Sequence, residues 1–168
     1  AKRRPEIDLI DGKVSEFGMG WAQSRGWHDV YTFTKAMGEQ IFVKELGETR
    51  GAIIRPAIIE SVWRSPQPGW LNGYRMLDPL IVAYGRGRLI DFPGNRSGVL
   101  DIMPVDLVVS AILAIAREIY QGRAKPVYQL ASGMENPLIV QRFADLVDEY
   151  FQENPFEGQT DDKGHRRE

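Results

Sequence analysis

Tyr31 and Lys35 are the residues whose types and spacing best suit chemistry. They lie four positions apart in "HDVYTFTKAMGEQ" (28–40), inside a segment that we expect to be helical over 30–46. Residues four apart on a helix lie one above the other. A free tyrosine ionises only near pH ~10, and a nearby ammonium group stabilises the phenolate. Such a phenol can exchange a proton with an oxygen on a carbon that receives hydride, while the lysine can donate hydrogen bonds to a ribose.

The spacing alone also fits a plainer interpretation, in which a solvated lysine follows a partly buried tyrosine. The helix that carries the pair has two apolar stripes, which consist of Val30, Phe33, Met37 and Ile41 on one side and of Gly38, Phe42 and Leu46 near Tyr31 and Lys35. A helix that is apolar on two sides is expected to be buried between two layers. A core helix explains both stripes equally well, so the chemistry must find support elsewhere.

The rest of the chain alternates between strand and helix patterns. We expect a strand at 52–60 that ends near Pro56, a Pro- and Trp-rich loop at 61–73, helices at 74–85, 106–122 and 136–151, and short strands at 88–94 and 126–132. Asp106 is the expected N-cap of the helix at 106–122, and Asn136–Pro137 is the expected start of the last helix. The apolar face of that helix is predicted to contain Ile139, Phe143, Leu146, Val147 and Tyr150.

This alternation predicts an α/β fold, specifically the second half of a doubly wound, Rossmann-like domain. No Gly-rich segment joins an expected strand to an expected helix, so the phosphate-binding first βα unit of such a domain is missing from the pattern. We predict an irregular lead-in at 1–29, the half-domain with its substrate-binding segment at 30–151, and a polar tail at 152–168.

Composition excludes several classes of function. Hydrophobic residues make up 43% and charged residues 26% of the 168 residues, which is ordinary for a globular protein, and the net charge of −2 gives no reason to expect nucleic acid as a partner. There is no cysteine, and the two histidines, His28 and His165, are far apart, so no metal site is expected. No apolar run is long enough to span a bilayer. A cytoplasmic location is expected.

Four segments in order resemble one family. Tyr31-x-x-x-Lys35 followed by "IIRPAII" is similar to the second half of an extended short-chain dehydrogenase/reductase. "RPAIIESVWRSPQPGWLNG" (55–73), "LDIMPVDLVVSAILAIA" (100–116) and "VYQLASGMENPL" (127–138) resemble the fatty acyl-CoA reductases, also called male-sterility proteins. The resemblance extends over about residues 27–150.

This resemblance implies NADPH-dependent reduction of a fatty acyl-CoA to an aldehyde or alcohol. Tyr31 would be the proton donor, and Lys35 would hold the nicotinamide ribose. The resemblance also implies residues along the nicotinamide, at Pro56, Ile58 and Ile59, and residues that wall the acyl channel, at Trp63 and Trp70, although either tryptophan could equally be packing alone. A homodimer through the helix at 30–46 is one further expectation.

The departures from the family pattern are the missing Gly-rich loop and the missing upstream serine or threonine of the active site. Ser15 and Ser24 are the only serines before Tyr31, and neither follows a strand-like run. We therefore expect the isolated chain to bind NADPH poorly and to have little activity. Three alternatives stay open: a thioester reductase domain that acts on carrier-bound acyl chains, a nucleotide-sugar epimerase or dehydratase, and a non-catalytic interaction module.

Overall fold

A computed structural model describes residues 5–46, 50–92 and 94–156 of the chain. It divides into two compact units, Ala1–Gly51 and Ala52–Glu168, and each is described by itself. Most of the polar tail predicted at 152–168 lies outside the described residues, and the predicted domain boundaries stay a prediction.

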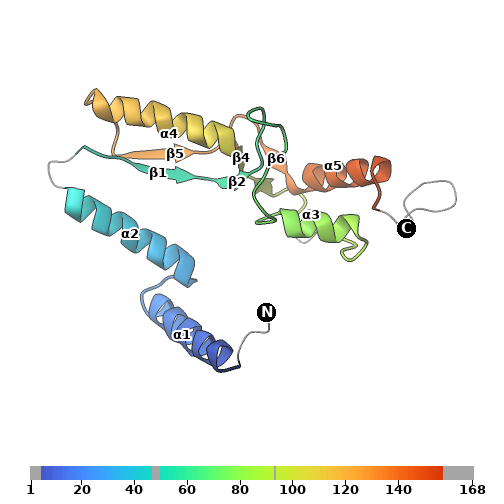
Figure 1. Cartoon of the computed structure of the whole chain (residues 1–168), viewed down its shortest axis with the longest axis horizontal. Helices are drawn as coiled ribbons and strands as arrows, with labels where there is room; N and C mark the ends of the chain where they lie inside the picture. The colour runs from blue at the N-terminus through green and yellow to red at the C-terminus, as the bar shows by residue number, and fades with distance from the viewer. Residues whose placement is uncertain (1–4, 47–49, 93, 157–168) are drawn as a thin grey trace. The chain divides into compact units, whose positions relative to one another are not determined.

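The first unit is a pair of helices, α1 (Pro5–Gln23) and α2 (Val30–Leu46) (Figure 1). The helix expected at 30–46 is therefore confirmed. The irregular lead-in expected before it is wrong, because most of 1–29 forms α1. Three glycines within α1 weaken the helical signal in the sequence. One of them, Gly18, lies where the helices approach: a Cβ there would lie 3.3 Å from Cγ2 of Val30, so the Val30 side chain would have to shift slightly.

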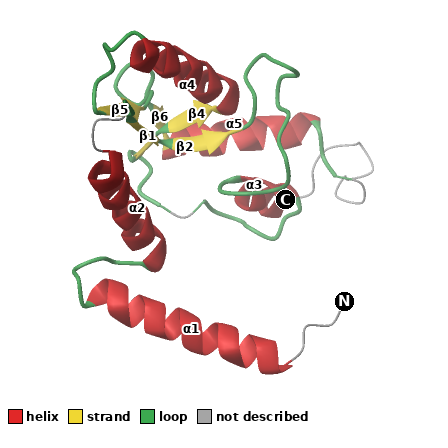
Figure 2. Ribbon diagram, turned by 60° about the vertical axis from the view of Figure 1, so that its left-hand side comes forward, coloured by secondary structure: helices red, strands yellow, loops and turns green. Residues whose placement is uncertain are grey.

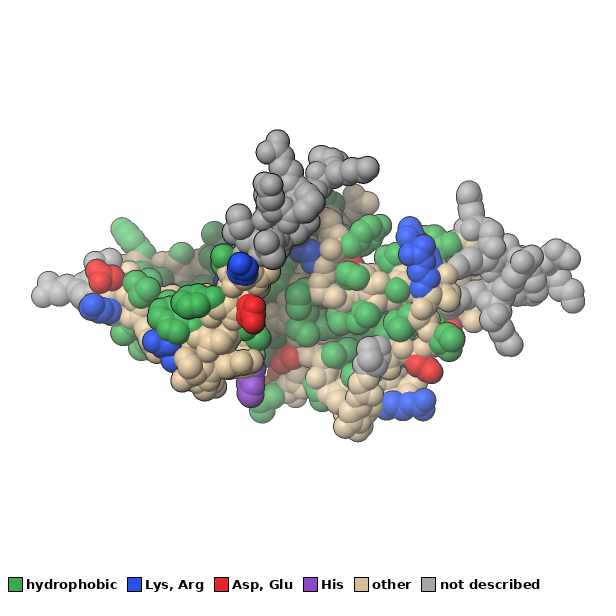
Figure 3. Space-filling view, turned by 90° about the horizontal axis from the view of Figure 1, so that it is seen from below, with side chains coloured by type: hydrophobic (Ala, Val, Ile, Leu, Met, Phe, Trp, Pro, Cys, Tyr) green, Lys and Arg blue, Asp and Glu red, His purple; other side chains and the backbone are tan. Residues whose placement is uncertain are grey.

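Aromatic side chains hold these two helices together. The ring of Phe33 on α2 is buried and packs edge-on against Trp21 of α1, with ring centroids 6.0 Å apart. Trp27, in the turn between the helices, lies 6.5 Å from the same ring. The expectation that α2 is buried along both sides is wrong for the described residues, since Ile41, Phe42 and Val43 are exposed. Apolar side chains at the molecular surface are visible in green in Figure 3.

The start of α2 is fixed by Asp29. Its Oδ1 accepts a hydrogen bond of 2.7 Å from the backbone N–H of Thr32, which is the N-cap arrangement that satisfies a free donor in the first turn. An aspartate directly before Val30, the first residue of α2, is the sequence signal for this cap. The cap fixes the turn from which Tyr31 projects.

The capping hydrogen bond predicts that the stability of α2 depends on pH. The Thr32 N–H bond holds the pKa of Asp29 below its ordinary value. The carboxylate therefore stabilises α2 at neutral pH, and this contribution is lost as the pH falls through the lowered pKa. We expect Asp29→Asn, which caps without titrating, to reduce the loss of helix at acid pH seen by circular dichroism. Asp29→Ala should weaken the helix at every pH, and equal acid profiles for Asp29→Asn and the wild type would contradict the cap.

In the described residues of the second unit, three two-stranded pairs are flanked by three helices (Figures 1 and 2). Strand β1 (Ile53–Pro56) runs parallel to β5 (Val127–Leu130), and β2 (Ile58–Glu60) runs parallel to β4 (Ile102–Pro104). The third pair, β3 (Val99–Leu100) with β6 (Leu138–Ile139), is antiparallel. The α/β fold class with short parallel pairs, typical of part of a Rossmann-like domain, is therefore confirmed.

The strand expected at 52–60 changes its partner halfway. The N–H of Ala57 still bonds the carbonyl of Leu130 at the end of β5, and the next N–H, of Ile58, bonds the carbonyl of Asp101 before β4. Pro56 offers no N–H at this point. One extended run thus forms β1 and β2, each with its own parallel partner.

The helices of this unit are α3 (Asp78–Gly85), α4 (Val105–Tyr120) and α5 (Val140–Glu153). Helix α4 runs alongside the strands on one face, and α3 lies next to α5 (Figures 1 and 2). Two expected starts are wrong: the cap of α4 is Pro104 without a side-chain hydrogen bond, and Asn136–Pro137 precedes β6, so that α5 begins at Val140. The strand expected at 88–94 is not seen at the described positions of that segment.

Candidate functional site

Tyr31 and Lys35 share one face of α2. The Nζ atom of Lys35 lies 5.5 Å from the centroid of the Tyr31 ring, and Tyr31 is 70% exposed. Lys35 is exposed as well. A side chain added at Gly38, one turn further on, would meet nothing within 4 Å, so the backbone there is open to close approach. The ammonium and the phenol can therefore both reach a ligand that lies against this face.

The other predicted site residues lie in the second unit: Pro56 ends β1, Ile58 and Ile59 lie in β2, and the two tryptophans lie in the loop that follows β2. Side chains along a strand alternate between its two faces. Ile59 is exposed, whereas Ile58 on the other face is half-buried between its neighbours. Pro56 ends β1 and is exposed. Ile59 and Pro56 are therefore accessible from outside, and Ile58 belongs to the opposite face of β2.

A cavity of about 330 Å³ opens at the carboxyl end of β2. Its apolar wall comes from the end of β2, the following loop and the first residue of α4, and consists of Ile59, Trp70, Leu71 and Val105. Its polar groups include Glu60, Asn72 and Arg75. Ligands of open α/β sheets bind beyond the carboxyl ends of the strands. This cavity has that position, and it combines an apolar wall with polar groups that also include Ser61 and Asp78, as small-molecule sites combine both kinds.

The two predicted channel tryptophans have different roles. Trp70 lines the cavity together with Ile59, while Trp63 is not among the residues around it. Instead, the guanidinium of Arg64 stacks over the Trp63 ring at 3.7 Å. Both side chains are 51% exposed, so neither is a core residue. The structure thus brings together Ile59 and Trp70 and separates Trp63 from them.

Glu60 is a site residue that sequence reasoning missed. It ends β2, lines the cavity and accepts a hydrogen bond of 3.2 Å from the backbone N–H of Leu77, just before α3. Burial raises the pKa of Glu60 above its ordinary value, although the Leu77 N–H favours the ionised form. A charged residue at the end of an apolar strand, "AIIE", was the available signal.

Asp106 is the second missed residue. Its Oδ1 accepts the N–H of Trp63 at 3.0 Å, and its Oδ2 accepts the N–H groups of Arg64 at 3.0 Å and Ser65 at 3.4 Å. These hydrogen bonds, first that of Trp63, hold the pKa of Asp106 below its usual range. The carboxylate is therefore not a helix cap but an anchor for the loop that follows β2.

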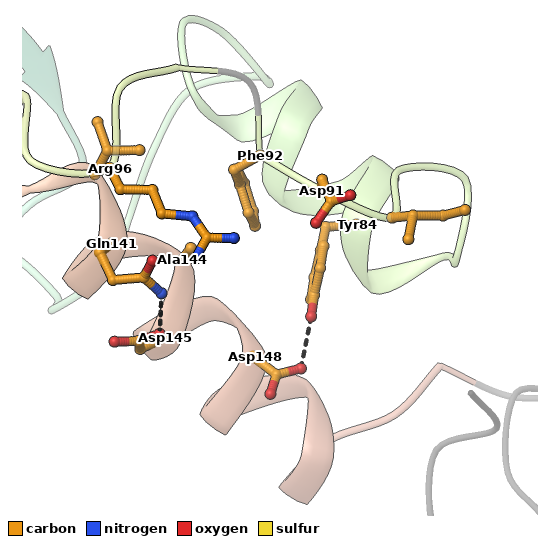
Figure 4. Close-up of a pocket in the computed structure, with 10 residues that line it drawn as sticks. Tyr84, Asp91, Phe92, Arg96, Gln141, Ala144, Asp145 and Asp148 are labelled. Atoms are coloured by element: carbon orange, nitrogen blue, oxygen red, sulfur yellow. Dashed lines mark hydrogen bonds between the residues drawn. The ribbon is translucent and has the colours of Figure 1, made fainter.

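A second cavity, of about 190 Å³, lies between α3 and α5 (Figure 4). The phenol of Tyr84 donates a hydrogen bond of 2.6 Å to Asp148, and the amide of Gln141 donates one of 2.7 Å to Asp145. Phe92 stacks on Tyr84 with ring centroids 5.0 Å apart. None of the site residues predicted from the sequence lines it, and the Tyr84–Asp148 hydrogen bond joins the two helices across it, so we regard it as a structural contact.

Tyr31 and Lys35 suit the nicotinamide end of a dinucleotide better than its phosphates. An ammonium and a phenol on an open helix face can meet ribose hydroxyls and a reacting oxygen. By contrast, the direct strand-to-helix junctions in the described part of the chain, at 104–105 and 139–140, contain no glycine. Within the described ranges, no group of three histidine, aspartate or glutamate side chains could hold a metal ion, and no helix is long and apolar enough to cross a membrane.

Comparison with known proteins places these features in a family. A family model of an NAD-binding domain, described as male sterility protein, matches residues 12–112, which indicates a nicotinamide cofactor. A chloroplastic fatty acyl-CoA reductase 2 of Arabidopsis thaliana is 40% identical over 148 residues, which cover 85% of this chain and 24% of the relative. An alcohol-forming fatty acyl-CoA reductase of Simmondsia chinensis is 36% identical, with coverages of 88% and 30%.

A fatty acyl-CoA reductase 2 of Homo sapiens is 34% identical over 135 residues, which cover 79% of this chain and 26% of the relative. The chain spans about a quarter to a third of the length of the curated relatives it matches. The family match covers more than half of this chain and includes the Tyr31–Lys35 helix, the Arg-Pro strand and the start of α4. The chain belongs to the male sterility protein family.

Proposed function

We propose that the protein that carries this chain reduces a fatty acyl thioester with NADPH. The observation that carries the proposal is the pairing of Tyr31 and Lys35 on one exposed face of α2, with the Lys35 Nζ 5.5 Å from the Tyr31 ring centroid. The names of the relatives, which are fatty acyl-CoA reductases, support the same substrate class. When bound, the nicotinamide supplies a hydride to the carbonyl carbon of the thioester.

In this proposal Tyr31 gives its phenolic proton to the carbonyl oxygen as the negative charge develops there. Lys35 donates hydrogen bonds to the ribose and stabilises the phenolate that Tyr31 becomes. The hemithioacetal then releases the thiol and leaves an aldehyde. A second reduction, which consumes a second NADPH and takes its proton from Tyr31 again, gives the alcohol.

For the second unit taken by itself, the proposal is that the cavity at the end of β2 holds an acyl chain. Ile59, Trp70, Leu71 and Val105 give it apolar walls, and burial of each methylene stabilises binding by about 0.8 kcal/mol. Pro56 and Ile59, at the exposed end of the strand, are proposed to lie along the nicotinamide. A polar sugar substrate, as an epimerase would need, suits these walls poorly.

The test is an assay of the full-length protein with palmitoyl-CoA and either NADPH or NADH, followed by loss of reduced-cofactor absorbance. We expect oxidation of NADPH that depends on palmitoyl-CoA and yields long-chain aldehyde or alcohol. A matched assay with the same acyl chain on a carrier protein separates a CoA-dependent enzyme from a carrier-dependent one. If neither palmitoyl-CoA nor the carrier-bound acyl chain causes oxidation of the cofactor, the proposal is overturned. Faster turnover with NADH than with NADPH would overturn the choice of cofactor.

The compartment and the dimer stay predictions. One relative is described as chloroplastic, so a cytoplasmic location does not follow from the family. The stripe proposed for a dimer is only partly available, because Phe33 packs against α1 whereas Ile41 is exposed.

A further inference from the structure

The loop between β2 and α3 is closed by two hydrogen bonds that join Val62 to residues 69 and 70. These residues form the base of the loop. The N–H of Val62 bonds the carbonyl of Trp70 at 3.0 Å, and the N–H of Gly69 returns a bond of 2.8 Å to the carbonyl of Val62. Val62 is 4% exposed, so this base is fixed in the core. Gly69 has a φ of +76°, which favours glycine at the turn back. The position of Trp70 is thereby coupled to that of the residues that follow Val62.

Asp106 holds the outgoing side of this closed loop. Its carboxylate accepts three successive N–H groups, from Trp63, Arg64 and Ser65. Strands β2 and β4 are parallel and in register, with Glu60 opposite Pro104, so the loop and the start of α4 leave the sheet side by side. This pairing brings Asp106 to the loop, across more than forty positions of sequence.

We propose that Asp106 is a positioning residue that sets the acyl-chain preference of the site. It acts through the loop. The carboxylate fixes residues 63–65, the two hydrogen bonds at the base of the loop couple these residues to Trp70, and Trp70 lines the cavity together with Ile59 and Val105. The proposal rests on the proposed function, because the ligand in the cavity is taken to be an acyl chain. It assigns no contact between Asp106 and the substrate.

Loss of the Asp106 anchor should weaken the binding of long acyl chains more than that of short ones. A loosened Trp70 removes part of the apolar wall. If the acyl chain then loses the burial of about two methylenes, its affinity falls about tenfold. Asp106→Asn in the full-length protein should raise KM for palmitoyl-CoA about tenfold, leave kcat within about twofold, and change octanoyl-CoA little. Glu118→Gln is the matched control, since it makes the same chemical change on α4, at an exposed pair with Arg123. Glu118→Gln should leave KM and kcat unchanged for both palmitoyl-CoA and octanoyl-CoA.

A readout that needs no activity accompanies the kinetics. In the chain itself, Asp106→Asn should speed amide hydrogen exchange at residues 63–65 and, to a smaller extent, at Val62, Gly69 and Trp70, whereas Glu118→Gln should not. If Asp106→Asn fails to fold, Trp70→Ala tests the same wall from its exposed side. It should raise KM for palmitoyl-CoA about tenfold and change octanoyl-CoA little. Where Asp106→Asn does fold, the double variant should lose no more than either single variant.

The outcomes separate the two proposals. Unchanged exchange at 63–65, or an equal loss for palmitoyl-CoA and octanoyl-CoA in Asp106→Asn and Trp70→Ala, would overturn the positioning role and leave acyl reduction standing. A wild-type protein that reduces no acyl thioester would overturn both, because the cavity would then hold no acyl chain. A selective rise in KM together with faster exchange at 63–65 supports the proposal.

Discussion

Replacing Tyr31 by phenylalanine in the full-length protein should lower kcat for acyl-CoA reduction by at least 10²-fold. The change removes only the phenolic oxygen, and proton transfer by a positioned side chain contributes about 10²- to 10⁴-fold. Tyr31 is 70% exposed at the start of α2, so phenylalanine should neither disturb packing nor unfold the helix. KM should change little, because the phenol acts mainly as the negative charge develops on the carbonyl oxygen. Steady-state kinetics with palmitoyl-CoA and NADPH measure both quantities.

Tyr150→Phe is the matched control for this experiment. Tyr150 is also an exposed tyrosine on a helix, and its ring contacts Phe151 edge-on, a contact that phenylalanine keeps. This variant should retain wild-type kcat. If Tyr31→Phe retained it as well, the phenol would not be the proton donor, and the interpretation of the chain as a non-catalytic interaction module would gain support.

The local features of the chemical pair were predictable from the sequence. Helix α2 has the predicted bounds because its apolar residues recur at helical spacing, and "GETRG" ends the pattern. A four-residue spacing on a helix then fixes the shared face of Tyr31 and Lys35 without any tertiary information. Whether this face is open to a ligand depends on packing, and here the expectation of burial on both sides was wrong.

The features that depend on pairing between distant strands were not predictable. Asp106 has the sequence position of an N-cap, but β2 and β4 end side by side and deliver three loop N–H groups to its carboxylate instead. Likewise, Asn136–Pro137 looks like a helix start, yet Leu138 and Ile139 first pair with β3. In both cases a local preference of a few residues yields to hydrogen bonds made across the sheet.

Helix α1 also depends on contacts that the local sequence does not reveal. Its glycines and mixed charges give a weak helical pattern, so the sequence favoured an irregular segment. The helix is supported by contacts that need its partner, namely Ala22 buried in the unit and Trp21 against the Phe33 ring. Helical stability in proteins comes mostly from such packing and less from intrinsic propensity.

Replacing Phe151 by alanine should lower the free energy of unfolding of the second unit by about 3–5 kcal/mol, the usual cost of truncating a buried phenylalanine. Phe151 is 5% exposed and lies where α5 meets α3, directly over Gly85, while Phe156 stacks on its ring with centroids 5.4 Å apart. The sequence placed its neighbour Tyr150, not Phe151, on the buried face of α5. Urea unfolding of the whole chain, followed by circular dichroism, measures the change as a lower midpoint at similar slope.

Tyr150→Ala is the control, because Tyr150 is exposed and its truncation should cost far less. Gly85→Ala tests the same contact from the other helix: its Cβ would lie 2.3 Å from Cζ of Phe151, so the ring must move, at a cost of about 1–3 kcal/mol. If Phe151→Ala cost no more than Tyr150→Ala, the α3–α5 contact would not be part of the core. Because α3 follows directly from the loop that carries Trp70, such a result would also remove the support on which that wall of the cavity depends.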